Sequence, residues 1–110
     1  MQIKFYLTNS GRSPVEEFLE TLSGDIQGEF FDAVSLLAAG KTLEMPISRN
    51  LSSICHGLHE LRFKDRAGQV RVFYFIKKGD AIYMLHALRK KTQAIPNKER
   101  DLVLKRIQEV

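Results

Sequence analysis

One stretch decides the fold: LHELRFKDRAGQVRVFYFIKKGDAIYMLHALRKKT, from Leu58 to Thr92. Apolar and polar residues alternate from Leu58 to Lys64, a nearly continuous apolar run follows from Val70 to Ile76, and a third run covers Ala81 to Leu88. Alternation with a period of two indicates a half-buried strand, and the continuous run is typical of a central strand covered on both faces. Since turn residues separate the runs, we predict three consecutive strands joined by tight turns.

The chain before this stretch begins with a further predicted strand. Gln2–Leu7 alternates between apolar and polar residues, as a half-buried strand does. A helix is then expected, because Ser13 and Glu16 have the spacing of a capping box and Pro14 suits the first helical position.

A second helix and a long loop are expected next. Ser23-Gly24 should end the first helix, and Asp25 should cap the second, which Gly40 ends. The two helices carry apolar stripes and should form a hairpin. From Lys41 to Gly57 the periodicity lapses and Pro46 occurs, which indicates a connecting loop.

The last element is a predicted helix after Pro96, with Asn97 as its cap. The order is therefore β-α-α-β-β-β-α, a single domain over residues 1–110. We predict an α+β fold, a small antiparallel-rich sheet with the helical hairpin packed on one face.

Composition points to a basic protein of the cytoplasm. The 110 residues carry a net charge of +4, and thirteen of the seventeen Lys and Arg residues lie from Arg62 onward. The lone Cys55 excludes a disulfide framework. The opening segment is too short and polar for a signal peptide, and no apolar run reaches a membrane-spanning length, so we expect neither secretion nor membrane contact.

Two arginines within the predicted sheet are the first candidate site residues. Arg62 lies on the strand face opposite Leu61 and Phe63, and Arg71 stands in a strand that is otherwise apolar. An arginine in a central strand is paired or faces a cleft. Spacing alone gives equal weight to two interpretations: ion pairs with Glu60 and Asp65, or a clamp on a phosphate.

The histidines do not have the spacing of a metal site, and we expect no metal or other cofactor. His86 is a candidate general acid or base, although a histidine with a purely structural role is commoner. The sequence also lacks a glycine-rich phosphate loop, a catalytic acidic pair and a serine nucleophile motif. An enzyme whose working groups are cations suits RNA cleavage, in which the ribose 2′-hydroxyl is the nucleophile.

Three pieces of sequence occur in a specific order: Glu60-Leu61-Arg62, then Gly68 with Arg71-Val72-Phe73-Tyr74, and Leu85-His86 leading to Lys90-Lys91-Thr92. Together they resemble the RelE/ParE toxin superfamily, and more narrowly its phage-derived, HigB-like branch. Their order and spacing extend the resemblance over essentially the whole chain. Related sequences often have Gly-Phe and a polar residue where this chain has Ala87-Leu88-Arg89.

The resemblance implies a toxin of a type II toxin–antitoxin system that cleaves translated mRNA at the ribosome without a metal. Its partners would be mRNA, the ribosome and a cognate antitoxin, expected to be a helix-turn-helix protein. The predicted catalytic residues are Arg62, Arg71, Lys90 and His86. The predicted RNA-binding residues are Lys64, Arg89, Lys91 and Tyr74.

Other functions remain open at this point. A toxin of the same fold can act instead as a ParE-like topoisomerase inhibitor, or survive as an inactive relic that binds only an antitoxin. A basic sheet can also serve as a plain RNA-binding module, whose RNA remains intact and whose binding is sensitive to salt.

Overall fold

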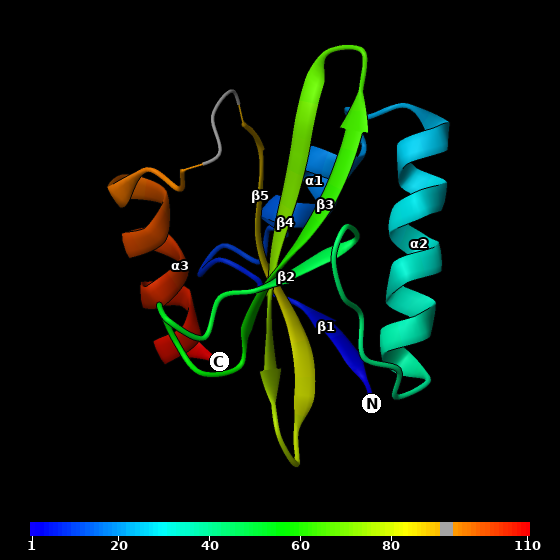
Figure 1. The fold of residues 1–110 in the computed structure, drawn as a ribbon. Coiled ribbons are helices and arrows are strands. Elements are labelled where there is room, and N and C mark those ends of the chain that lie inside the picture. Colours follow the sequence, from blue (N-terminus) through cyan, green and yellow to red (C-terminus); the bar gives the residue numbers. More distant parts are fainter. Residues whose placement is uncertain (91–93) are drawn as a thin grey trace.

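A five-stranded mixed sheet forms the centre of the protein, with α2 on one face and α3 on the other (Figure 1). The computed structural model describes residues 1–90 and 94–110. The elements are β1 (Ile3–Phe5), α1 (Pro14–Leu19), α2 (Gly24–Ala38), β2 (Ser48–Asn50), β3 (Leu58–Asp65), β4 (Gly68–Lys77), β5 (Ala81–Lys90) and α3 (Asn97–Glu109). The predicted α+β class is confirmed.

The predicted antiparallel strands β3, β4 and β5 are confirmed as the middle of the sheet, whose full order is β1-β5-β4-β3-β2. β1 closes one edge by pairing in parallel with β5, Ile3 opposite Ile82. A bulge in β5 follows Met84 and shifts the register against β4, so that Phe73 faces His86 while Tyr74 faces Met84. Each strand of this trio continues to the turns, and β5 runs two residues beyond the predicted Leu88 to Lys90.

Two apolar clusters hold the helices on opposite faces of the sheet. The larger one joins α1 and α2 to one face, as predicted for the helical hairpin, with Val15 and Phe30 fully buried. The smaller one joins α3 to the other face through Val103, Phe73 and Leu85. Burial on both faces explains why the β4 sequence is almost continuously apolar.

The strand β2 lies inside the segment that was predicted to be a loop, so that prediction is wrong in part. It pairs with β3, Arg49 opposite Glu60, and its pairing is extended by a hydrogen bond from the Arg62 amide to the Ile47 carbonyl (2.8 Å). Three residues are too few to show a period of two, so the alternation that reveals longer strands is absent here.

Two predicted helix caps are corrected. Ser23 rather than Asp25 caps α2, because its side chain accepts a hydrogen bond from the Ile26 amide (3.3 Å), and Gly24 is the first helical residue. Asn97 is the first residue of α3 and not its cap, a position that Pro96 takes without a side-chain hydrogen bond. The predicted Ser13 cap of α1 is confirmed.

Candidate nucleic-acid interface

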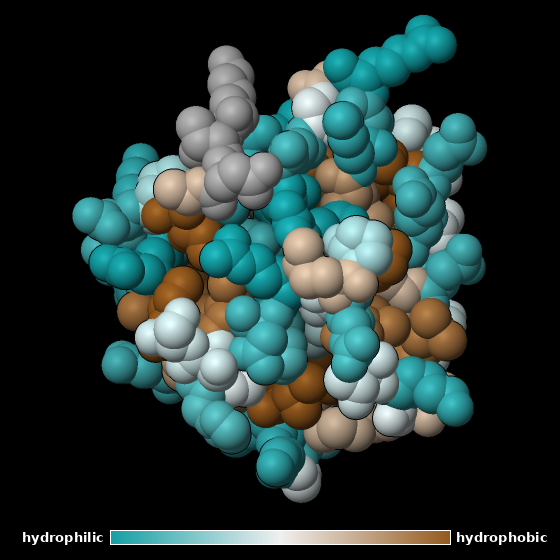
Figure 2. Space-filling model, in the orientation of Figure 1, coloured by the Kyte–Doolittle hydropathy of each residue, from teal (hydrophilic) through white to brown (hydrophobic). Residues whose placement is uncertain are grey.

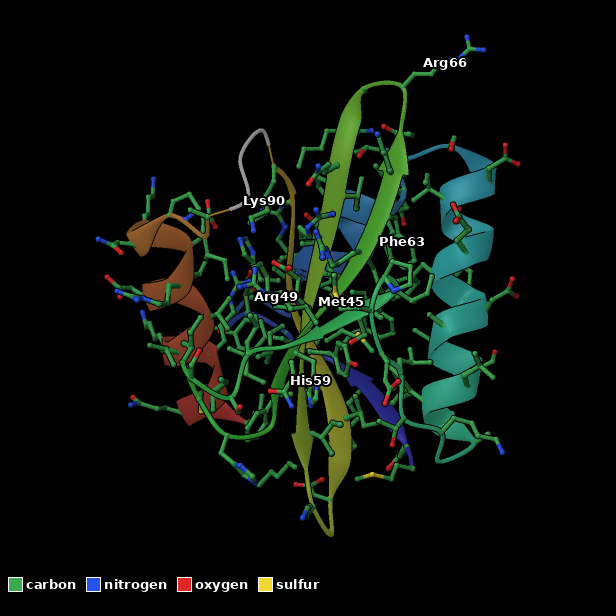
Figure 3. All side chains as sticks on the ribbon, in the orientation of Figure 1. Met45, Arg49, His59, Phe63, Arg66 and Lys90 are labelled. Carbon is green, nitrogen blue, oxygen red and sulfur yellow. The ribbon has the colours of Figure 1, made fainter. Side chains whose placement is uncertain are left out.

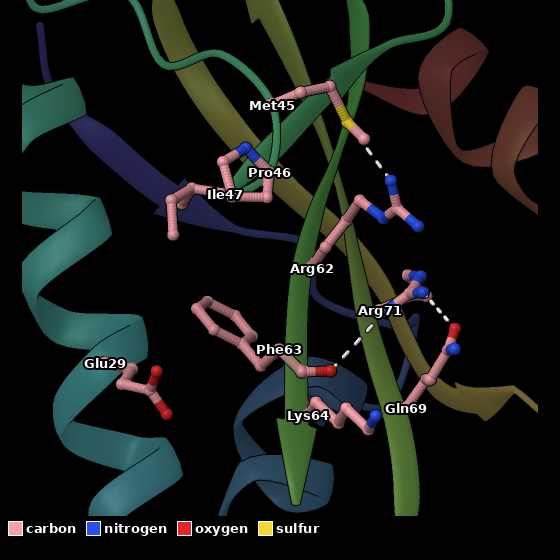
Figure 4. A pocket seen from close by; sticks show the side chains of 9 residues that line it. All are labelled: Glu29, Met45, Pro46, Ile47, Arg62, Phe63, Lys64, Gln69 and Arg71. Atoms are coloured by element: carbon pink, nitrogen blue, oxygen red, sulfur yellow. Dashed lines mark hydrogen bonds between the residues drawn. The ribbon is translucent and has the colours of Figure 1, made fainter.

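A group of cations lies on the α3 side of the sheet, next to the apolar contact with that helix. Alternation along β3 places Arg62 and Lys64 on this side, because Leu61 and Phe63 pack into the core under α2. Figure 4 shows the Arg62 and Arg71 side chains on one side of the strands and Phe63 on the other. The basic face, as we call this group, consists of Arg49, Arg62, Lys64, Arg71 and Lys90.

Strand register brings the basic face together. Arg62 of β3 is directly opposite Arg71 of β4, and Arg49 of β2 is directly opposite Glu60. Like charges that face each other across strands are destabilising unless an anion lies between or beside them. The sheet therefore concentrates positive charge at a position where nearby anionic groups would be stabilising.

The basic face has a buried level and an exposed level. Arg71 and Lys90 are only 3% and 6% exposed, whereas Arg49 and Lys64 are exposed and Arg62 is half-buried. Figure 3 shows Arg49 and Lys90 beside the strands, on the side of the sheet that faces α3. A ligand that approaches this face meets Arg49, Arg62 and Lys64 first.

Hydrogen bonds fix the buried guanidinium of Arg71 in one position. Its Nη1 donates to the carbonyls of Val70 (3.0 Å) and Phe63 (3.4 Å), and its Nη2 donates to the side-chain oxygen of Gln69. Its Nε is buried without a hydrogen-bond partner, 3.7 Å from Oε1 of Glu60. Three hydrogen bonds from Nη1 and Nη2 thus hold the guanidinium in place, and its Nε faces Glu60.

Glu60 supplies the negative charge between the two buried cations. Its side chain is 1% exposed, with Oε2 3.3 Å from Lys90 Nζ. Asp65, the other acid expected to pair with the arginines, binds Arg89 instead, at 2.7 and 2.8 Å. The ion-pair interpretation therefore holds for Arg71 with Glu60, but not for Arg62 with Asp65.

One carboxylate does not neutralise this cluster. Burial lowers the pKa of Lys90 and of Arg71, and the nearby Glu60 opposes that shift in both. Repulsion from Arg49 lowers the pKa of each further. An excess of positive charge in a poorly hydrated position favours binding of an anion.

His86 lies at the contact between β5 and α3. Its ring stacks on Phe73, its Nε2 hydrogen-bonds the Glu99 carboxylate, and its Nδ1 is 3.4 Å from Nη1 of Arg106. Because Arg106 only donates, Nδ1 is the acceptor and Nε2 carries the proton. Burial lowers the pKa of His86 and outweighs the opposing effect of Glu99. Both ring nitrogens hold α3 on the sheet.

Two further predicted site residues, Arg89 and Tyr74, do not join the basic face. Arg89 binds Asp65 across the ends of β3 and β5. Tyr74 is 1% exposed, its hydroxyl hydrogen-bonds Ser48 (2.7 Å), and its ring stacks on His59. That ring belongs to the core and is not available to stack on a ligand. Lys91 lies outside the described residues.

Sequence reasoning missed one residue of this site, Arg49, and did not predict the burial of another, Glu60. Arg49 belongs to a strand too short to be predicted, and only the register against Glu60 reveals its position. Glu60 was considered only as a possible ion-pair partner. Its place in an apolar strand was the available signal, since a buried carboxylate requires compensation.

Within residues 1–90 and 94–110, no group of three His, Cys, Asp or Glu side chains is placed to hold a metal ion. Among the helices of the same residues, none combines the length and apolar character needed to cross a membrane.

A family model of phage-derived proteins resembling Gp49 (DUF891) matches residues 17–108. The chain belongs to this Gp49-like family. The match begins within α1 and ends within α3, so it includes every residue of the basic face. No curated protein matches the chain. The phage-derived part of the expected resemblance is confirmed.

In this Gp49-like protein a cavity of about 460 Å³ adjoins the basic face at the edge of β3 (Figure 4). Its wall combines cations with apolar side chains and one acid: Glu29, Met45, Pro46, Ile47, Arg62, Phe63, Lys64, Gln69 and Arg71. In Figure 2 hydrophobic residues (brown and tan) reach the surface between hydrophilic ones (teal) on this side of the molecule. A volume of this size suits a small ligand or part of a larger one.

Proposed function

We propose that this Gp49-like protein is the toxin of a type II toxin–antitoxin system, a metal-independent endoribonuclease that cleaves translated mRNA at the ribosome. The observation that carries the proposal is the convergence of five cations from four strands on one face of the sheet. The phage-derived family and the resemblance to HigB-like toxins within the RelE/ParE superfamily support it. The proposed setting is the bacterial cytoplasm, with a helix-turn-helix antitoxin as partner.

The two levels of the basic face suit different tasks in this reaction. The exposed Arg49, Arg62 and Lys64 would bind the RNA backbone. The buried Arg71, fixed by its hydrogen bonds, would stabilise charge that develops on the phosphorane, because a preorganised cation needs no reorganisation during the reaction. The ribose 2′-hydroxyl would attack the adjacent phosphorus and displace the 5′-oxygen of the next nucleotide.

For proton transfer we favour Lys90 over His86. Burial lowers the pKa of Lys90, which makes its neutral amine more accessible near neutral pH. His86 already uses both ring nitrogens to connect β5 with α3.

The proposal is tested by expression of the protein in bacteria, with growth recorded and mRNA ends mapped. Arg62→Ala is the informative variant, because Arg62 is only half-buried and its removal should leave the fold intact. Arg66→Ala is the matched control, since Arg66 extends from the tip of the β3–β4 hairpin (Figure 3). Wild type and Arg66→Ala should arrest growth and create new mRNA ends, and Arg62→Ala should do neither. Growth arrest without new ends contradicts the proposal.

One observation favours a second function. Arg71 and Lys90 both form ion pairs with the buried Glu60. Such pairing is expected of a basic sheet that binds a partner and does not cleave RNA. A topoisomerase inhibitor of the same fold, or a relic that binds only an antitoxin, fits that arrangement. Inhibition of DNA gyrase supercoiling by the purified protein identifies the inhibitor, whereas a ribonuclease leaves supercoiling unchanged.

A further inference from the structure

We propose that the cavity at the edge of β3 binds one unpaired nucleobase of the RNA whose backbone lies on the basic face, with a preference for guanine. The inference rests on the proposed function for the nature of the ligand. It adds a base-reading site to a surface that otherwise recognises only phosphates.

The segment before β2 gives the cavity an apolar wall. Met45 and Ile47 are 57% and 42% exposed, which is unusual for large apolar side chains, and Pro46 lies between them. Figure 4 shows this wall facing Arg62 across the edge of the strand. An exposed apolar wall suits the face of a base, because unpaired bases are bound mainly by stacking and apolar contact.

Backbone hydrogen bonds hold this wall in place before any ligand arrives. The Ile47 carbonyl accepts from the Arg62 amide at 2.8 Å, and the Ser48 amide donates to the Glu44 carbonyl at 3.1 Å. β2 runs alongside β3 only as far as Leu61, so the cavity lies at the part of the β3 edge beyond it. A preformed wall lowers the entropic cost of binding.

The cations of the cavity identify the charge of its ligand. Arg62 and Lys64 line it from β3, and Arg71 lines it from the register position opposite Arg62. Positive charge next to an apolar wall fits a ligand that joins an anion to a flat ring, as a nucleotide does. It disfavours a basic side chain of a partner protein.

The Glu29 carboxylate indicates on which side of the cavity the base lies and which base is preferred. It lines the cavity from α2, on the side away from Arg62 (Figure 4). A carboxylate repels a phosphate but accepts hydrogen bonds from ring and exocyclic N–H groups. Guanine alone among the four RNA bases offers two adjacent N–H donors of this kind, so a carboxylate that accepts both favours guanine.

The three methionines allow a direct test with isotopically labelled methyl groups in NMR. Met45 lines the cavity, whereas Met84 is fully buried in the core and serves as the internal reference. The probes are guanosine monophosphate, uridine monophosphate and ribose phosphate. We expect guanosine monophosphate to shift the Met45 signal, to leave Met84 unchanged, and to bind about tenfold more tightly than ribose phosphate.

Matched variants separate the two recognition elements. Glu29→Gln should reduce the preference for guanosine over uridine monophosphate about tenfold, as loss of hydrogen bonds to a charged acceptor does. Asp32→Asn changes the same charge one turn further along α2 and should have no effect. Ile47→Ser should weaken both nucleotides, whereas Leu36→Ser, on the exposed surface of α2, should not.

The outcomes also separate this inference from the proposed function. Equal binding of ribose phosphate and guanosine monophosphate, or an unshifted Met45 signal, overturns the base site even if mRNA is cleaved in cells. A Met45 shift that only nucleotides produce, and that Ile47→Ser abolishes, supports the site even if no cleavage is found. Unchanged selectivity in Glu29→Gln overturns the preference for guanine.

Discussion

Glu60 and Lys90 form an ion pair of 3.3 Å in which both side chains are almost wholly inaccessible to solvent. They come from β3 and β5, on either side of the central strand β4, and Arg71 of β4 is the third member of the cluster. Removal of any one of these three charged side chains is costly, because the charged groups left behind remain buried and cannot be hydrated.

Replacement of Glu60 by Ala should therefore be strongly destabilising. Removal of one partner from a buried ion pair costs about 3–5 kcal/mol, since Lys90 and Arg71 would remain buried without their counter-ion. Urea denaturation followed by circular dichroism measures the loss. The control is Glu20→Ala at the exposed end of α1, expected to change the free energy of unfolding by less than about 0.5 kcal/mol. A similarly small effect at Glu60 contradicts the prediction.

Arg62→Ala should weaken RNA binding while the stability of the fold is retained. If Arg62 contacts one phosphate, its loss lowers the slope of log K against log salt by about one unit. Fluorescence anisotropy with a short labelled RNA over a range of salt concentrations gives the slope. Arg66→Ala should leave it unchanged. Equal slopes for wild type and Arg62→Ala would place the RNA elsewhere.

Acidification should destabilise the protein in part through His59. Burial lowers the pKa of His59, whose ring stacks on Tyr74 with centroids 5.0 Å apart. The unfolded chain therefore binds a proton more readily than the folded one as the pH falls below about 6.5, and the free energy of unfolding decreases there.

The variant that isolates this effect is His59→Phe, which keeps an aromatic ring but cannot titrate. Urea midpoints measured between neutral and mildly acidic pH should fall less for His59→Phe than for wild type. His56→Phe, at an exposed position, should retain the wild-type loss. If His59→Phe loses as much stability on acidification as wild type, another group is responsible.

Gly57→Ala should be more destabilising than Gly79→Ala. Both glycines have positive φ, at +90° and +78°, but an added Cβ at Gly57 would lie 2.9 Å from the Ile76 carbonyl oxygen, whereas Gly79 has open space. The backbone penalty is common to both, and the collision adds about 1–3 kcal/mol at Gly57 alone. Thermal unfolding of the two variants compares them directly, and equal melting temperatures would contradict the role of the close contact.

The central strands could be predicted from the sequence because their signals are local. Alternation in β3 and the apolar run of β4 each follow from the faces that those strands bury. The alternation also placed Arg62 on the side opposite Leu61. By contrast, β2 is fixed by distant groups, among them the hydrogen bond between Ser48 and Tyr74, which lie 26 residues apart.

The positive charge of the site could be predicted from the sequence, but the burial of its individual side chains could not. A run of cations after Arg62 indicated a basic surface, but which cations are exposed depends on packing around β4. Burial separates Arg71 and Lys90 from Arg62 and Lys64, and no local pattern distinguishes them. The sequence left the role of His86 open between a general acid or base and a structural histidine, and only the packing of α3 brings Glu99 and Arg106 to its ring.

The parallel pairing of β1 with β5 has a consequence for the order of events during synthesis. β1 cannot pair at the edge of the sheet until Ile82, the partner of Ile3, has been synthesised. Closing so long a loop is also entropically costly. The basic face also takes Lys90 from the last strand, after β1 to β4 have left the ribosome. A nascent chain therefore cannot assemble the basic face until β5 has been synthesised almost to its end, so any activity of this face arises only late in translation.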